Sequence, residues 1–156
     1  MPEYEEIKVA PIRNGTVIDH IKAGQALNVL RILGLNENTI DSSVVIAMNV
    51  YSESCNGRKD IIKIEDKELE EEMVNKIALI SPSATIDTIR DYYVAEKKPV
   101  HIDDHIVGLA KCSNPNCITN VGEPISPEFD VISRDPPVIR CMYCERHMTD
   151  ITNNLL

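Results

Sequence analysis

Aromatic side chains are scarce in this chain, and long apolar runs are missing from it. Its 156 residues include no Trp and a single Phe, and aromatic residues make up 4% of the sequence. The hydrophobic core must therefore come mainly from Ile, Val and Leu, within an ordinary hydrophobic content of 43%. No uninterrupted apolar stretch approaches the roughly 18 residues of a membrane span. We therefore expect a soluble protein without a membrane partner.

Positive charge is also in short supply. The chain has 25 acidic and 16 basic residues, which gives a net charge of −9. Such a chain repels the phosphates of nucleic acids unless its lysines are segregated, so we expect no nucleic-acid partner. The sequence opens on an acidic segment, residues 1–6, that leads into no apolar core of a signal peptide. We therefore expect the protein to be cytoplasmic.

Four cysteines form two closely spaced pairs in the last third of the sequence. Cys112 and Cys117 make a C-x4-C pair, and Cys141 and Cys144 make a C-x2-C pair. Each spacing can bend a turn that points two thiolates at one centre, and four sulfurs complete the tetrahedron that Zn²⁺ favours in structural sites. We predict one structural zinc ion per chain. Two disulfides are the alternative, but they need an oxidising compartment, and the odd Cys55 fits a reducing cytosol better.

The residues before the cysteines predict alternating strands and helices. Residues 44–48 form a nearly continuous apolar run, typical of a central strand buried on both faces. Asp66 is expected to cap the second helix. Two amphipathic helices can cover one face of a sheet, so we predict an α+β fold, a ferredoxin-like sheet with both helices on one face. The expected strands are 6–12, 16–21, 44–48, 58–65, 85–90 and 92–97, and the expected helices are 24–33 and 67–80.

The chain is predicted to divide into two domains, residues 1–102 and residues 103–156. The segment 97–99, Lys-Lys-Pro, suits the exit from the first domain. The second part has short β-like runs and too small an apolar core to stand without its metal. We expect it to be a small all-β zinc domain.

Two polar features of the first domain point to a binding face. Asp19 and His20 are adjacent in a β-rich run and must face opposite sides of a regular strand. One of them is then buried or faces a ligand, or the two form a hydrogen-bonded pair at a strand end. In the strand 58–65, Ile62 and Ile64 share the core face, so Lys59 and Lys63 lie on an open face that meets solvent or an anion.

Three segments resemble a known family in their order and spacing. They are Arg-Asn-Gly-Thr-Val-Ile-Asp-His-Ile at 13–21, Gly-Arg-Lys-Asp-Ile-Ile-Lys-Ile-Glu at 57–65, and the cysteine pairs. Over essentially the whole chain, the sequence resembles the regulatory chain of aspartate carbamoyltransferase. The resemblance implies a non-catalytic subunit of pyrimidine biosynthesis with a nucleotide-binding domain and a zinc domain that docks on the catalytic chain. It also implies that regulatory chains pair to bridge catalytic trimers, that CTP inhibits, often with UTP, and that ATP activates.

The resemblance further implies a set of nucleotide contacts. Asp87 departs from the family pattern, since family members can carry an amide there, and a carboxylate repels a triphosphate unless a metal ion or a lysine intervenes. By resemblance, Asp19 and Lys63 meet the ribose and base edge, His20 and Lys97 meet the triphosphate, backbone groups of Ile12, Tyr92 and Val94 read the base, and Lys59 adds positive potential.

Two other classes of protein are weaker readings of the sequence. A zinc-ribbon nucleic-acid adaptor would need basic residues clustered around the cysteines, and this region has few beyond Lys111, Arg134, Arg140 and Arg146. A nucleotide-using enzyme would need a nucleophile–base arrangement or a phosphate-binding loop, and neither motif is visible.

Overall fold

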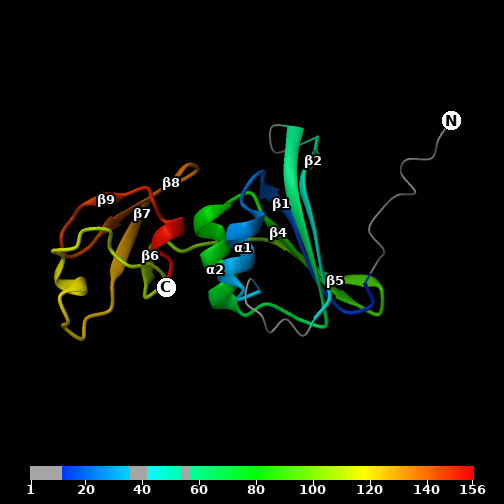
Figure 1. The fold of residues 1–156 in the computed structure, drawn as a ribbon, viewed down its shortest axis with the longest axis horizontal. Coiled ribbons are helices and arrows are strands. Elements are labelled where there is room, and N and C mark those ends of the chain that lie inside the picture. The colour runs from blue at the N-terminus through cyan, green and yellow to red at the C-terminus, as the bar shows by residue number, and fades with distance from the viewer. Residues whose placement is uncertain (1–11, 36–41, 54–56) are drawn as a thin grey trace.

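A computed structural model describes residues 12–35, 42–53 and 57–156, and the predicted strand 6–12 lies outside them except for Ile12. The described chain forms two antiparallel sheets, with two α-helices in its first part (Figure 1). The elements are β1 Gly15–Lys22, α1 Ala26–Ile32, β2 Val44–Tyr51, β3 Arg58–Glu65, α2 Glu71–Ile80, β4 Thr85–Arg90, β5 Tyr93–Pro99, β6 His105–Val107, η3 Ile118–Asn120, β7 Glu128–Arg134, β8 Pro137–Cys141, β9 His147–Met148 and η4 Thr152–Asn154.

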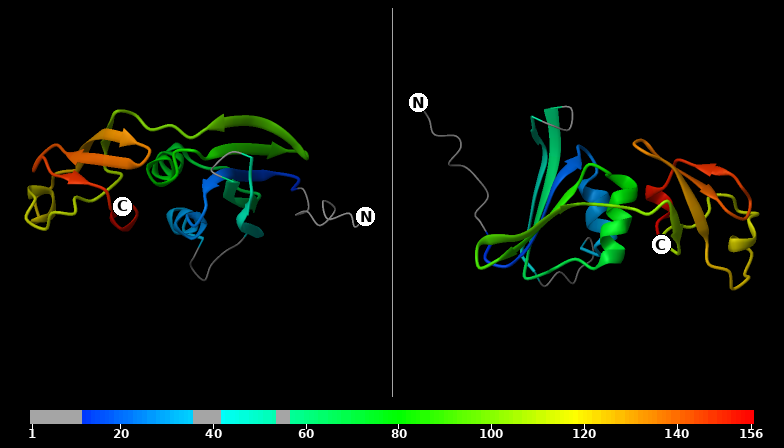
Figure 2. Two further views of the ribbon diagram at one scale, coloured as in Figure 1. Left: turned by 90° about the horizontal axis from the view of Figure 1, so that it is seen from above. Right: turned by 180° about the vertical axis from the view of Figure 1, so that it is seen from behind.

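The first sheet has the strand order β2-β3-β1-β4-β5. Helix α1 follows β1 and helix α2 follows β3, and both helices lie on one face of the sheet, as Figure 2 shows from two sides. This β-α-β-β-α-β arrangement is ferredoxin-like, with β5 added beside β4. The predicted fold class is confirmed.

Strand alternation separates a core face from an open face. Ile18 of β1 pairs with Ile62 of β3, and both are fully buried, as is Ile64. Because successive side chains of a strand point to opposite faces, Lys63 lies on the face away from the helices. The core is aliphatic, as the lack of aromatic residues predicts.

The ends of the two helices follow from local backbone chemistry. Helix α1 ends at Ile32, two residues before Gly34, whose φ of 72° is left-handed. Leu35 then donates its N–H to the carbonyl of Leu30 and closes the end of the helix. Helix α2 starts at Glu71, later than predicted. Asp66 does not cap it, because this residue has a φ of 58° and donates its N–H to the Asn14 carbonyl.

The prediction of a central strand at 44–48 is wrong. Strand β2 contains this run and forms an edge of the sheet, and it leaves Val45, Ile46, Met48 and Tyr51 exposed. An apolar run indicates a strand, but it does not indicate whether residues of the same chain or a partner molecule bury that strand.

The second sheet has the order β6-β7-β8-β9 and lies beside the helices (Figure 1). Its buried residues include Phe129 and Ile139, and they belong to the same hydrophobic cluster as the buried residues of the first sheet and helices, together with Ile102 and Ile106. The Lys76 ammonium group of α2 donates to the main-chain oxygen of the last residue, Leu156. In the described ranges, no helix is both long and apolar enough to cross a membrane.

Candidate metal centre and nucleotide site

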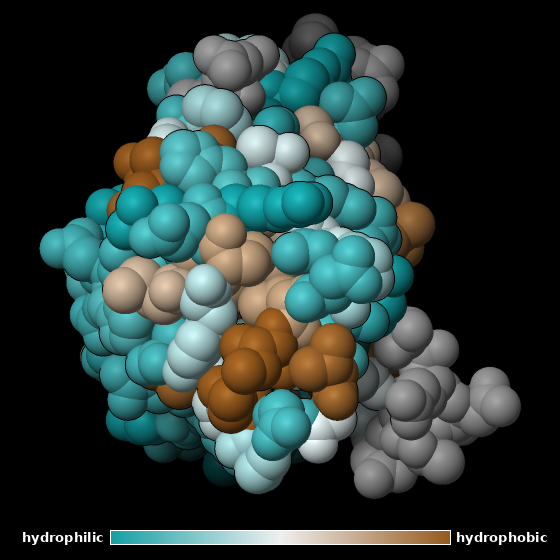
Figure 3. Space-filling view, turned by 90° about the vertical axis from the view of Figure 1, so that its left-hand side faces the viewer, coloured by the Kyte–Doolittle hydropathy of each residue, from teal (hydrophilic) through white to brown (hydrophobic). Residues whose placement is uncertain are grey.

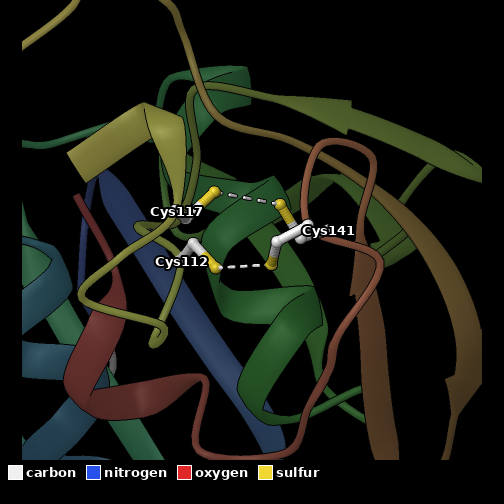
Figure 4. Close-up of side chains that lie close together, drawn as sticks. Cys112, Cys117 and Cys141 are labelled. Atoms are coloured by element: carbon white, nitrogen blue, oxygen red, sulfur yellow. Dashed lines mark hydrogen bonds between the residues drawn. The ribbon is translucent and has the colours of Figure 1, made fainter. Parts of the chain in front are cut away.

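The four paired cysteines converge on one point, although they are up to 32 residues apart in sequence. Their sulfurs all lie within 4.8 Å of one another, with 3.6 Å between Cys112 and Cys144 and 3.7 Å between Cys117 and Cys141. Figure 4 shows the sulfurs of the three labelled residues gathered at this centre. A tetrahedral Zn–S distance of about 2.3 Å requires sulfurs about 3.8 Å apart. The cluster therefore fits a structural zinc ion with a complete coordination sphere.

The surroundings of the sulfurs favour thiolates unequally. Burial raises the pKa of the Cys112 thiol to about 12. Burial also works against ionisation of Cys144, but hydrogen bonds to its sulfur, the Arg146 backbone N–H among them, lower its pKa to about 7. Four neighbouring thiolates repel one another, so a cation must neutralise them for all four to bind together.

Four of the predicted nucleotide residues lie on the open face of the first sheet. Lys63 pairs with Val17, Val17 pairs with Asp87, and Asp87 pairs with Lys97, so these residues form one row across four strands. Asp19 lies two residues further along β1 on the same face. Lys97 is exposed on the outer strand, whereas Lys63 and Asp87 are half-buried.

Asp19 and His20 do not point to opposite faces of a regular strand. The pairing of β1 with β3 shifts between Ile18 and Ile21, which leaves two residues of β1 facing one residue of β3. His20 has a φ of 56°, and its Nδ1 lies 3.1 Å from the Thr85 hydroxyl oxygen. The bulge holds both side chains near the same end of the open face.

A lysine of the predicted set already neutralises Asp19. The Lys59 Nζ lies 2.9 Å from an Asp19 oxygen, and the backbone N–H of His20 donates to the same oxygen at 2.6 Å. Burial works to raise the pKa of Asp19, but these two partners outweigh it and the pKa is lowered. Asp19 is therefore a carboxylate at neutral pH.

Asp87 lacks such compensation. Its Oδ1 is buried and has no hydrogen-bond partner among the described residues. Burial raises the pKa of Asp87, Lys97 across the strand pair opposes that rise, and the nearby Asp19 carboxylate adds to it. Burying an acceptor without a donor costs free energy. A ligand donor or a cation at this oxygen would reduce that cost.

The remaining predicted residues lie near the start of β1 and the turn between β4 and β5, at the opposite end of β1 from Asp19 and His20. Val94 pairs with Ile89 at the end of the β4–β5 hairpin, and the Tyr92 N–H bonds the Arg13 carbonyl beside the buried Ile12. A cleft of about 410 Å³ includes Tyr92, and a second of about 570 Å³ includes His20 and Lys59. A third, of about 400 Å³, lies on the helix side and contains none of the predicted nucleotide residues.

Asp60 organises this region, and sequence reasoning missed it. Its side chain is fully buried and accepts from the backbone N–H groups of Gly24, Ala26 and Asn49 at 2.9, 3.0 and 2.7 Å. It thereby joins β3 to the start of α1 and to β2, where Asn49 sits in a second bulge. The period-two pattern contained the signal, because Asp60 falls on the core face with Ile62.

A ferredoxin-like sheet with charged residues on its open face, joined to a four-cysteine cluster suited to one metal ion, defines a two-part metal-binding protein. Comparisons with known proteins make this class specific. The family model of the aspartate carbamoyltransferase regulatory chain, allosteric domain, matches residues 7–101, and that of the same chain's metal binding domain matches residues 104–153.

Curated relatives agree with both family models. The aspartate carbamoyltransferase regulatory chain of Methanothrix thermoacetophila is 55% identical over 145 residues, which are 93% of each chain. The Pyrococcus furiosus protein of that name is 54% identical over 93% of this chain and 94% of its own. The Thermococcus sibiricus protein is 51% identical over 97% and 99%. This chain belongs to the family of aspartate carbamoyltransferase regulatory chains; it is thus a regulatory subunit and not an enzyme.

Proposed function

We propose that residues 1–102 bind the nucleotide effectors CTP, UTP and ATP, and that residues 103–156 transmit the effect to the catalytic chain of aspartate carbamoyltransferase. The row of Lys63, Asp87 and Lys97 lies on a sheet face that no described helix covers, and it carries this proposal because it combines cations for phosphates with polar groups for a sugar and base. The protein acts in the cytoplasm, where reduced thiols persist.

The nucleotide would lie along the open face. Its base meets the turn near Tyr92 and Val94, its ribose lies over the row at Lys63, and its phosphates meet Lys97 and His20. The ion pair of Lys59 with Asp19 sets the charge at that end of the face. The step from the ribose at Lys63 to the phosphates at Lys97 would cross β1 and β4, which separate these two lysines in the row.

Calorimetric titration of two lysine variants tests the nucleotide assignment. Lys97→Ala should weaken triphosphates more than monophosphates, because its charge interacts with the outer phosphates. Lys63→Ala should weaken nucleosides and nucleotides by the same factor. If both variants respond equally to phosphate number, the two roles are wrongly assigned.

The second part of the chain carries the proposed contact with catalytic trimers. Figure 3 shows apolar side chains gathered among hydrophilic ones at this end of the molecule. Replacing any of the four cysteines by Ala should abolish assembly with catalytic trimers and leave nucleotide affinity intact, as measured by size-exclusion chromatography and calorimetry. Loss of both properties together would contradict a division of labour between the domains. The exposed large apolar residues of this part are Val107, Ile118, Val121, Ile132, Met142, Tyr143 and Leu156.

The β2 edge is the proposed surface for pairing of two regulatory chains. Among the described strands β2 has a neighbour on one side only, and such an apolar edge invites another strand. Ile46 and Met48 are exposed there at 36% and 43%. Met48→Lys should shift the purified chain from dimer to monomer in sedimentation analysis. Met142→Lys, with a similarly exposed side chain in the other sheet region, should leave the dimer intact. A dimer that survives Met48→Lys would place the pairing surface elsewhere.

A further inference from the structure

The short η3 turn that follows the first cysteine pair contacts the metal centre twice. Thr119 donates its hydroxyl to the sulfur of Cys117 at 3.2 Å. Asn120 donates its side-chain amide to the carbonyls of Cys112 and Asn114 at 2.8 and 2.7 Å. Both protons of the amide group are thus used to close the loop that carries the first cysteine pair.

From these contacts we propose that Thr119 and Asn120 are positioning residues that retain the zinc ion. The hydroxyl of Thr119 stabilises negative charge on Cys117, so this sulfur stays a thiolate and resists the protonation that would release it from the metal. Asn120 holds the backbone of the loop between Cys112 and Cys117 in place through two carbonyl oxygens. The two sulfurs therefore keep their separation when a chelator competes for the metal.

The two contacts make different predictions. Hydrogen-bonded neighbours of metal ligands typically change metal affinity about 10–100-fold. Thr119→Val keeps the shape of the side chain but removes the donor, so zinc transfer to a chromophoric chelator should accelerate about 10-fold. Thr119→Ser keeps the hydroxyl and should transfer zinc within about 2-fold of the wild-type rate. Asn120→Asp keeps the size of the side chain, removes the amide donor and should also accelerate transfer.

Cobalt spectroscopy separates an electronic role from a merely structural one. With Co²⁺ in place of Zn²⁺, loss of the hydroxyl from a thiolate should move the sulfur-to-cobalt charge-transfer band to longer wavelength in Thr119→Val. The band should stay in place in Thr119→Ser and Asn120→Asp. Thr149→Val, at an exposed position of the same part of the chain, is the matched control and should change neither rate nor band.

The outcomes decide between the roles without an enzyme assay. All variants are studied as full chains, with circular dichroism showing that each is folded at the start. If Thr119→Val accelerates zinc transfer but leaves the sulfur-to-cobalt charge-transfer band in place, the hydroxyl of Thr119 does not act on the charge of the Cys117 thiolate. Wild-type transfer rates in both Thr119→Val and Asn120→Asp would overturn the proposal altogether.

Discussion

At the scale of single residues, the buried carboxylate of Asp60 is the strongest candidate for a stability determinant. Asp60→Asn removes an acceptor oxygen and places an amide against backbone N–H groups that it cannot satisfy. We expect a loss of about 3 kcal/mol in the free energy of unfolding, measured by urea denaturation. Asp103→Asn, at a side chain that is 84% exposed, should change it by less than about 0.5 kcal/mol.

Asp87 provides a second prediction at this scale, about ligands. Its Oδ1 lacks a partner, and its carboxylate lies in the row with Lys97. Asp87→Asn removes a negative charge, so it should tighten triphosphate binding at low magnesium and matter less at high magnesium, where the cation screens the phosphates. Titration calorimetry at two magnesium concentrations measures this. If the triphosphate affinity is the same in the wild type and in Asp87→Asn at both magnesium concentrations, Asp87 does not lie near the phosphates.

At the scale of elements, the entry into β1 depends on a glycine. Gly15 has a φ of 144°, and a Cβ there would come within 2.1 Å of the Ile64 carbonyl oxygen of β3. Gly15→Ala must push two paired strands apart, so we expect a loss of more than about 2 kcal/mol in unfolding experiments. Gly122→Ala is the control, because Gly122 has a φ of 89° but no atom within 4 Å of its Cβ position. It should cost about 1 kcal/mol, from backbone strain alone. Equal losses of stability in Gly15→Ala and Gly122→Ala would mean that the close approach of β3 does not restrict the residue at position 15.

The pairing of β6 with β7 contains a pH-dependent clamp. His105 lies between Asp130 at 3.1 Å and Glu128 at 3.2 Å. Hydrogen bonds to Asp130 first, and then to Glu128, raise the pKa of His105 above its ordinary 6.5. The clamp therefore stabilises the folded chain fully below pH 6.5, and this contribution is lost as the pH rises through the raised pKa.

The matching experiment compares thermal unfolding of the zinc-loaded wild-type chain with that of His105→Gln between pH 5.5 and 8. The wild-type advantage should be largest at the acidic end and shrink toward pH 8. The carboxylates do not interfere, because the pKa of Glu128 is lowered by Tyr143 and His105 and that of Asp130 by His105, so both stay ionised in this range. An advantage that grows with pH would contradict the clamp.

Sequence patterns predicted elements best where periodicity and burial agree. The bounds of β3 and β4 match the predicted strands, since their alternating residues meet the helices on one side only. Two features could not be read from periodicity. The bulge at Asp19 and His20 is a backbone irregularity, and the edge position of β2 depends on strand order, which is a long-range property. The cysteine cluster was predictable because metal geometry demands short ligand spacings.

At the scale of the whole molecule, the metal and the continuous apolar core act together. Chelation at neutral pH should unfold the region after about Asp104 first, because its four-stranded sheet has a small core of its own. Amide hydrogen exchange should show loss of protection in β7 and β8 before β1 and β3. The metal content of freshly purified, reduced protein should be one zinc per chain. Simultaneous loss of protection in both sheets would show that the chain unfolds as a single unit.

Communication between the two parts has a candidate contact in Lys76. This residue of α2 reaches the main-chain oxygen of Leu156, and its side chain is 15% exposed. It lies on the helix side of the sheet, away from the row that contains Lys63. Lys76→Met keeps the apolar stem and removes the charge, so nucleotide affinity of the isolated chain should be unchanged.

In the assembled holoenzyme, the same substitution should weaken coupling between nucleotide and a catalytic-site substrate analogue. Coupling of this kind typically amounts to about 1–3 kcal/mol and is reciprocal for binding. Lys76→Met should therefore reduce the effect of nucleotide on analogue affinity and the effect of analogue on nucleotide affinity by the same factor. Arg31→Met, which removes an exposed cation from α1, should preserve both effects. If Lys76→Met leaves both effects at wild-type strength in assembled enzyme, the contact between Lys76 and Leu156 does not carry the coupling.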